Sequence, residues 1–134
     1  MTIKEIQDQI NALQSQVELL NKERTELDWS NAPIICELNG SRWVLGPECP
    51  EELNWDDAIA WCKSVGGELP PRELLLMSFV NEEIRPLFTA TQYWSSTELA
   101  SAYAWTQYFT YGGQISHYYK TTAFYVRAVR KLDI

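Results

Sequence analysis

The sequence is poor in the residues that most often hold metals or carry out catalysis. It has one histidine, His117, and three cysteines, and no two of the cysteines form a CxxC pair. Zinc sites are built from several such ligands at close spacing, so we expect neither a metal nor a cofactor. No serine or cysteine stands in an interpretable arrangement with His117, and we expect it to be a surface or contact residue. The odd number of cysteines favours free, buried thiols, as in a reducing compartment: Cys36, Cys49 and Cys62.

Long apolar runs and an excess of positive charge are also missing. No stretch approaches the roughly 20 apolar residues of a membrane-spanning helix, and the polar N-terminus MTIKEIQDQINALQ lacks the apolar core of a signal peptide. The net charge of −7 disfavours nucleic acid and anionic membranes as partners. We therefore expect no membrane insertion, no nucleic-acid binding and no secretion through a signal peptide. The 134 residues, 46% of them hydrophobic, suit one modest folded domain and an appendage.

The appendage is predicted to be a coiled-coil helix over residues 2–28, which divides the chain into domains 1–29 and 30–134. Apolar residues recur there at alternating spacings of three and four, and Arg24 alone interrupts the series. The alternative is a single surface helix, but such a helix normally has a wider apolar stripe, and a lone helix this polar would be marginal in water. We predict a homo-oligomer, with a trimer preferred and a dimer or tetramer left open, because isoleucine fills both seam positions of the first heptad. The predicted oligomerisation residues are Ile3, Ile6, Ile10, Leu13, Val17, Leu20, Arg24 and Leu27.

The rest of the sequence predicts an α+β domain. Two short strands, 34–38 and 42–45, flank Asn39-Gly40-Ser41, which is typical of a hairpin turn. A helix is expected over 55–65, and Pro71 suits the first position of a second helix. Asn81 is expected to cap a further short turn. Four strands are then expected to form an antiparallel meander, near 93–97, 103–110, 114–121 and 123–131.

Acidic residues gather between Glu48 and Asp57. A cluster of carboxylates can bind calcium. However, Asn54 is well placed as a helix cap, and it puts Asp56 and Asp57 in the first helical turn, where negative charge is favoured. We favour helix capping over a calcium site.

All seven tyrosines of the chain lie between Tyr93 and Tyr125, where Glu98 and Lys120 are the only charged side chains. Tyrosine with serine, glutamine and glycine is typical of recognition surfaces, because a phenol ring gives a large contact area at a small cost in rotamer entropy. The alternative is a sheet whose aromatic side chains cover its own core, since aromatic residues favour strands. We favour a binding surface.

Motifs spread over residues 33–132 resemble a known family. The segments LNWDDAIAWC, GGELPPRELLLM, YWSSTE, AWTQYF and YVRAVR are together similar to the lectin-like C-terminal domain of bacterial collagen-like adhesins, which has relatives in phage and prophage proteins. The resemblance implies a C-type-lectin-like fold, shared with formylglycine-generating enzymes and with the receptor-binding variable proteins of diversity-generating retroelements. It also implies that the following are scaffold positions: Trp55, Ala58, Cys62, Leu69, Pro70, Glu73, Leu74, Trp94, Ser95, Ser96, Trp105 and Phe109.

Three positions depart from the family pattern. Ala128 stands where the family often has a cysteine that pairs with the equivalent of Cys62, Gln107 stands where an apolar residue is usual, and Pro71 replaces a threonine cap. The Gln107 layer is therefore expected to be polar or to face another subunit. The sugar-binding calcium motifs of this fold are absent from the second half of the domain, and no cysteine follows Cys62, as the oxygen- and copper-using enzymes of the fold require. We therefore expect calcium-independent binding and no enzymatic activity.

The resemblance to the variable proteins implies ligand contacts from exposed strands and loops between Glu98 and Thr122. We expect a binding or adhesion-type module on a homo-oligomeric coiled coil, encoded by a phage or prophage and located in the host cytoplasm or the virion, that binds a host protein or glycan. The alternative is an intracellular phage or prophage protein that modulates a host protein. The predicted ligand-binding residues are Tyr103, Tyr108, Tyr111, Gln114, Ser116, His117, Tyr118 and Tyr119.

Overall fold

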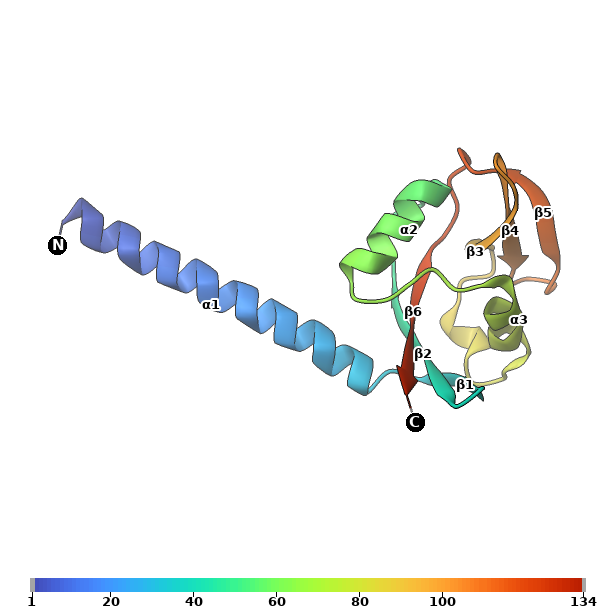
Figure 1. The fold of residues 1–134 in the computed structure, drawn as a ribbon, viewed down its shortest axis with the longest axis horizontal. Helices are drawn as coiled ribbons and strands as arrows, with labels where there is room; N and C mark the ends of the chain where they lie inside the picture. The colour runs from blue at the N-terminus through green and yellow to red at the C-terminus, as the bar shows by residue number, and fades with distance from the viewer. Residues whose placement is uncertain (1, 134) are drawn as a thin grey trace. The chain divides into compact units, whose positions relative to one another are not determined.

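The computed structural model describes residues 2–133, apart from the side chains of residues 19–28 and 30. The chain forms two compact units, Met1–Asn31 and Ala32–Ile134. The first unit is a helix, and the second, here called the head, contains the remaining helices and strands (Figure 1).

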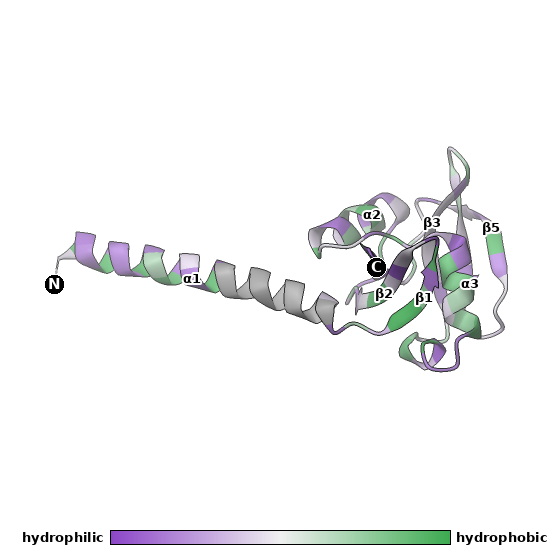
Figure 2. Ribbon diagram, turned by 60° about the horizontal axis from the view of Figure 1, so that its bottom comes forward, coloured by the Kyte–Doolittle hydropathy of each residue, from purple (hydrophilic) through white to green (hydrophobic). Residues whose placement is uncertain are grey.

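Helix α1 spans Ile3–Ser30, so the helix predicted over residues 2–28 is confirmed. The Thr2 hydroxyl oxygen caps its start by accepting a hydrogen bond from the backbone N–H of Glu5 (3.2 Å). At 1.5 Å per residue its 28 residues extend on the order of 42 Å. Polar and apolar residues alternate along its described part (Figure 2). Five of the predicted seam residues are exposed, namely Ile3, Ile6, Ile10, Leu13 and Val17, whereas Leu20, Arg24 and Leu27 lie outside the described side chains.

The first sheet of the head is antiparallel and contains β1 (Ile34–Leu38), β2 (Ser41–Glu48) and β6 (Arg127–Asp133) in that order. The predicted β1–β2 hairpin is confirmed. Its turn uses Asn39 and Gly40, whose φ angles are 53° and 78°. A two-residue hairpin turn needs positive φ at both positions if its twist is to match that of the flanking strands.

Helix α2 spans Trp55–Ser64 and begins with the predicted cap. The Asn54 side chain accepts a hydrogen bond from the Asp57 backbone N–H (2.9 Å), and Asp56 and Asp57 occupy the first turn. The negative charge there interacts favourably with the positive end of the helix dipole. The helix ends before Gly66, whose φ of 85° suits glycine. Capping therefore accounts for the second half of the acidic stretch.

Helix α3 spans Arg72–Val80 and is followed by a short 3₁₀ turn, Arg85–Leu87. Pro71 lies just before the helix, one position earlier than predicted. Asn81 caps the following turn as predicted, because its side-chain oxygen accepts hydrogen bonds from the backbone N–H groups of Glu83 (2.9 Å) and Ile84 (3.2 Å).

The second sheet contains β3 (Gln92–Ala100), β4 (Tyr103–Tyr108) and β5 (Gln114–Tyr119), in chain order and antiparallel. The prediction of a fourth strand in this meander was wrong. After a parallel bridge between Tyr93 and Tyr125, the chain leaves β3, and β6 pairs with β2 in the first sheet. Val129 is buried opposite Leu45 in the β2–β6 pair. This apolar contact favours the pairing of β6 with β2.

The hydrophobic core draws on both sheets and α3. It includes Leu45, Leu75, Tyr93, Phe109 and Val129. The rings of Phe88 and Phe109 stack at 4.1 Å, and Tyr93 packs against both of them edge-on. Of the sequence-predicted scaffold, Trp94 and Phe109 are buried and Trp105 is half-buried; Val126 and Ala128 are buried as well.

Within its described residues the chain is thus α+β, with three α-helices and two antiparallel three-stranded sheets. Among these residues, no helix has the length and apolar character that crossing a membrane requires.

Candidate functional site

The hairpin formed by β4 and β5 carries all eight predicted ligand-binding residues. Strand β5 lies at one end of the second sheet (Figure 1). Three of the eight side chains are exposed: Tyr111 at 83%, Tyr119 at 58%, and His117. The other five are half-buried: Tyr103, Tyr108, Gln114, Ser116 and Tyr118.

Tyr103 and Tyr119 form one aromatic pair of the hairpin. They lie directly opposite each other on β4 and β5, and their ring centroids are 4.8 Å apart. Interaction with the Tyr119 side chain raises the pKa of Tyr103 above its ordinary value. Packing of the two rings against each other limits their freedom before any ligand arrives, which reduces the entropy lost on binding.

Tyr108 and Tyr111 form a second aromatic pair, at the turn that joins β4 to β5. Their ring centroids lie 5.8 Å apart. The turn is tight, because the Gly112 N–H donates to the Tyr108 carbonyl (2.8 Å) and the Tyr108 N–H donates to the Gly113 carbonyl (2.8 Å). Tyr108 lies five positions after Tyr103 in β4, roughly 17 Å along the strand. The predicted surface therefore consists of two aromatic pairs at opposite ends of one hairpin.

Gln114 has a role inside the head. Its side-chain nitrogen donates to the Arg72 carbonyl (2.7 Å) and to the side-chain oxygen of Gln107 (2.9 Å). Gln107 is completely buried, so this layer of the head is polar. Gln114 ties β5 to the start of α3 and satisfies an amide that cannot reach water.

Tyr118 also contributes to packing. Its ring meets Phe124 edge-on at 4.6 Å, and Phe124 in turn meets the buried Trp94 at 5.0 Å. One side of Tyr118 thus supports β5 from within, and its half-buried state leaves only part of the ring for a ligand.

The two charges of the tyrosine-rich stretch interact with each other. Lys120 forms an ion pair with Glu98 (3.5 Å), and its ammonium group lies 4.2 Å from the centre of the Trp55 ring. Both interactions hold the lysine side chain, which is only 16% exposed. The surface around β5 is therefore close to electrically neutral.

Arg72 and Trp105 are a feature that the sequence did not indicate. The Arg72 guanidinium lies over the Trp105 ring, 4.0 Å from its centre, and the Arg72 backbone N–H donates to the Thr97 hydroxyl (3.0 Å). Stacking of this kind is a cation–π interaction. The two residues are distant in sequence, and nothing around either of them predicts the contact.

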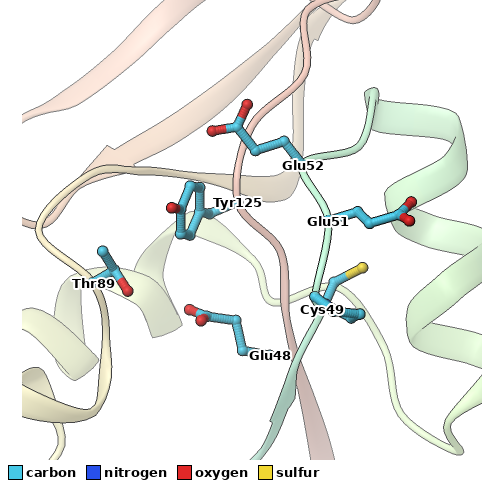
Figure 3. Close-up of a pocket in the computed structure, with 7 residues that line it drawn as sticks. Glu48, Cys49, Glu51, Glu52, Thr89 and Tyr125 are labelled. Atoms are coloured by element: carbon cyan, nitrogen blue, oxygen red, sulfur yellow. The ribbon is translucent and has the colours of Figure 1, made fainter.

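A cavity that we did not predict lies beside the end of β2 (Figure 3). Its volume is about 250 Å³, and it is lined by Glu48, Cys49, Pro50, Glu51, Glu52, Thr89 and Tyr125. Figure 3 shows Glu48 and Glu52 projecting to the side where Thr89 and Tyr125 lie, and Glu51 projecting to the other side. Glu48 is already engaged, since it accepts a hydrogen bond from the Tyr93 hydroxyl. Three glutamates around Pro50 were the available sequence signal for this cavity.

In the described part of the chain, the thiols and acidic side chains do not come together as a metal-binding group. The three cysteines are free, and Cys49 and Cys62 are buried. Burial raises the pKa of Cys62 to about 12, which leaves almost no nucleophilic thiolate at neutral pH. No group of three or more histidine, cysteine, aspartate or glutamate side chains within the described residues could hold a metal ion.

A second surface of interest lies on α1. The side chains of Ile10, Leu13 and Val17 form an open, mostly apolar strip, flanked by Gln14 and Glu18. An exposed apolar strip on a helix is typical of a surface that packs against another helix.

No protein-family model matches the sequence of this chain, and no protein of curated function matches it either.

Proposed function

We propose that the chain is a non-enzymatic binding module whose C-type-lectin-like head takes a host protein or glycan as its ligand. The β4–β5 hairpin is the proposed binding surface, and α1 assembles several copies through a coiled coil. The resemblance to phage and prophage proteins supports a location in the host cytoplasm or the virion. The observation that carries the proposal is the presence of exposed, uncharged aromatic side chains on the β4–β5 hairpin.

The exposure of these rings supports a role outside the fold. Tyr111 and Tyr119 leave 83% and 58% of their surface in water, so packing within the head covers less than half of either side chain. Tyrosine side chains at such positions can bury a large area against a ligand and also donate a hydrogen bond. The hydroxyl and imidazole groups of Ser116 and His117 add adaptable polar contacts on the same strand.

The exposed seam of α1 supports display in several copies. Apolar side chains at Ile3, Ile6 and Ile10 continue into Leu13 and Val17 at the three-and-four spacing of a coiled coil. The hydrophobic effect would favour association of these helices, because association removes the apolar side chains from water. Several heads on one stem would raise weak single-site binding to useful avidity.

The proposed surface can be tested with a double variant, Tyr111→Ala with Tyr119→Ala, and a matched control, Leu99→Ala. Leu99 is 53% exposed on β3 of the same sheet, so the control removes exposed apolar area outside the hairpin. Binding would be measured on a glycan array and in pull-downs from bacterial lysate. We expect the double variant to lose at least tenfold in binding to whichever ligand the unaltered chain takes, with its melting temperature unchanged, and the control to bind normally. Binding that survives in the double variant would reject this surface.

A further inference from the structure

Arg72 contacts all three strands of the second sheet. Its backbone N–H donates to the Thr97 hydroxyl of β3 (3.0 Å), and its carbonyl accepts a hydrogen bond from the Gln114 side chain of β5 (2.7 Å). Its guanidinium lies over the Trp105 ring of β4, 4.0 Å from the ring centre. These contacts hold both the backbone and the side chain of Arg72, so its charge has a defined place on the sheet before any ligand arrives.

The polar end of this guanidinium is still available. The Arg72 side chain is 35% exposed, and its Nε lies 3.5 Å from a carboxylate oxygen of Glu73. Charge-assisted hydrogen bonds between such groups are about 2.7–2.9 Å long, so the Glu73 contact is a loose surface ion pair, which contributes little. Within the described residues, neither Nη group of Arg72 has a hydrogen-bond partner. Both Nη groups can therefore donate to a ligand.

An aromatic shelf, made of Tyr103, Trp105 and Tyr119, lies on the same face of the sheet. The register shifts of this sheet place the extra residues in β3 and β5, so β4 keeps its alternation, and Tyr103 and Trp105 project to one side. Tyr119 lies opposite Tyr103, and the two rings are 4.8 Å apart. Alternate positions of a strand are roughly 7 Å apart. One ligand ring with a short substituent can therefore cover the tyrosine pair and reach the guanidinium on Trp105.

The groups around the shelf favour one kind of ligand. A guanidinium with two open Nη groups matches a carboxylate, which it binds through two parallel hydrogen bonds. Aromatic rings pack against the apolar face of a ligand ring. The Glu73 carboxylate, 67% exposed beside Arg72, can only accept hydrogen bonds, so it suits a ligand that carries hydroxyl groups next to its own carboxylate. A sugar acid has all three features.

An acidic side chain of a partner protein fits less well. Aspartate and glutamate carry a carboxylate but no hydroxyl group, so they would meet the negative charge of Glu73 without a hydrogen bond that offsets the repulsion. A sugar acid meets the same charge but donates a hydroxyl hydrogen bond to it. The pair of Arg72 and Glu73 therefore favours a glycan over a protein.

We propose that Arg72 binds the carboxylate of a sugar acid, such as a uronic or sialic acid, whose ring packs on the aromatic shelf. Glu73 accepts a hydrogen bond from a hydroxyl group of the same sugar. This inference rests on the proposed function and specifies its ligand as an acidic glycan. It also adds to the binding surface a residue of α3, outside the β4–β5 hairpin.

The first test changes the ligand and leaves the protein unaltered. Oligosaccharides that end in glucuronic acid or in sialic acid would be titrated into the full chain by calorimetry. The same oligosaccharides with the carboxylate converted to a carboxamide would be titrated in parallel. The carboxamide has nearly the same size but no charge, so we expect the best acidic oligosaccharide to bind at least about tenfold more tightly than its carboxamide.

The second test uses Arg72→Lys, which keeps the charge and the backbone hydrogen bonds of Arg72 but cannot form two parallel hydrogen bonds with a carboxylate. We expect it to bind the acidic oligosaccharide at least about tenfold more weakly, to bind the carboxamide almost unchanged, and to keep its melting temperature. Arg85→Lys is the matched control, because the Arg85 guanidinium also lies over an aromatic ring, that of Phe79, at 5.2 Å. It should change binding less than twofold.

Four results would overturn the inference. The first is equal affinity for the acidic oligosaccharides and their carboxamides. The second is an equal effect of Arg72→Lys and Arg85→Lys. The third is tighter, Arg72-dependent binding of acidic peptides, since the carboxylate would then come from a protein. The fourth is binding of acidic oligosaccharides that survives in the Tyr111/Tyr119 double variant, since the shelf would then have no part in it.

The same measurements separate this inference from the proposed function. If no acidic oligosaccharide binds, but the Tyr111/Tyr119 double variant still abolishes binding of a neutral glycan or a protein, the proposed function stands and the inference falls. If no ligand of the unaltered chain depends on the hairpin, both fail.

Discussion

At the scale of single residues, the Gln107–Gln114 pair shows how a position that looks like a ligand contact can belong to the fold. Gln107 is fully buried, and its side-chain oxygen accepts a hydrogen bond from Gln114. A buried amide oxygen without a donor is costly, because it loses its hydrogen bonds to water and gains none in return. Gln114 therefore stabilises the head through its side-chain nitrogen, which is the donor that it would otherwise offer to a ligand.

We predict that Gln114→Ala lowers the free energy of unfolding by about 1–3 kcal/mol, because it leaves the Gln107 oxygen and the Arg72 carbonyl without this donor. Chemical denaturation would measure the change. Thr121→Ala, at an exposed position just beyond β5, is the control and should change stability by less than about 0.5 kcal/mol. A Gln114→Ala variant with unchanged stability and reduced ligand binding would restore the original assignment of Gln114 as a binding residue.

The residues predicted correctly from the sequence are those whose partners are close along the chain. Asn54 caps Asp57 three residues later, and Asn39-Gly40 makes a turn by itself. Gln114 and Arg72 are separated by 42 residues, and no local pattern records their contact. Sequence reasoning could therefore identify the tyrosine-rich stretch but could not divide it into side chains that pack and side chains that stay exposed.

At the scale of secondary-structure elements, the same limit explains the misplaced last strand. The segment 123–131 has the alternation of a strand, which predicts that strand but not its neighbour. In the structure, Tyr125 bridges to β3, whereas Val129 pairs with Leu45 in β2. The choice between the two sheets depends on apolar contacts with residues far away in the sequence.

The turn between β4 and β5 allows a sharp test of this hairpin's geometry, because its two glycines differ. Gly112 has φ of 82°, and a Cβ atom added there would lie 2.5 Å from the Phe79 ring, whereas a Cβ on Gly113 would meet nothing within 4 Å. We predict that Gly112→Ala destabilises the head by at least about 1 kcal/mol, since a left-handed conformation costs other residues about 1–2 kcal/mol before any clash.

Gly113→Ala is the matched control and should be close to neutral in the same thermal and chemical denaturation experiments. Equal effects of the two substitutions would mean that the turn does not have this geometry. Because Tyr108 and Tyr111 are joined through the same turn, Gly112→Ala should also weaken ligand binding if that aromatic pair contributes to it.

At the scale of the whole molecule, the proposed function depends on assembly through α1. The helix itself was predictable because its apolar residues repeat at regular spacing, and a repeat of that kind requires no knowledge of distant contacts. The repeat does not predict a single number of copies, because its layers disagree. Isoleucine in the first heptad favours three helices, and the later isoleucine–leucine and valine–leucine layers favour two.

We predict that the unaltered chain sediments as a small multiple of its 15.5 kDa mass and that Ile10→Asp reduces the mass to that of a single chain. Ile10 belongs to the apolar strip of α1, and a carboxylate buried in a helix–helix seam without a partner costs several kcal/mol. Gln9→Asp adds the same charge one residue away, outside the predicted seam, and should leave the assembly intact. A monomeric unaltered chain, or an Ile10→Asp variant that remains assembled, would contradict the coiled coil.

The same pair of variants separates assembly from recognition. If each head binds by itself and α1 only brings heads together, Ile10→Asp should keep the hairpin's ligand preference, yet lose apparent affinity for a surface with many ligand copies, by a factor of about 10²–10⁴. Gln9→Asp should retain the full avidity on that surface. An Ile10→Asp chain that loses binding even to a single soluble ligand would place part of the binding site between heads, because no intact head would then be sufficient.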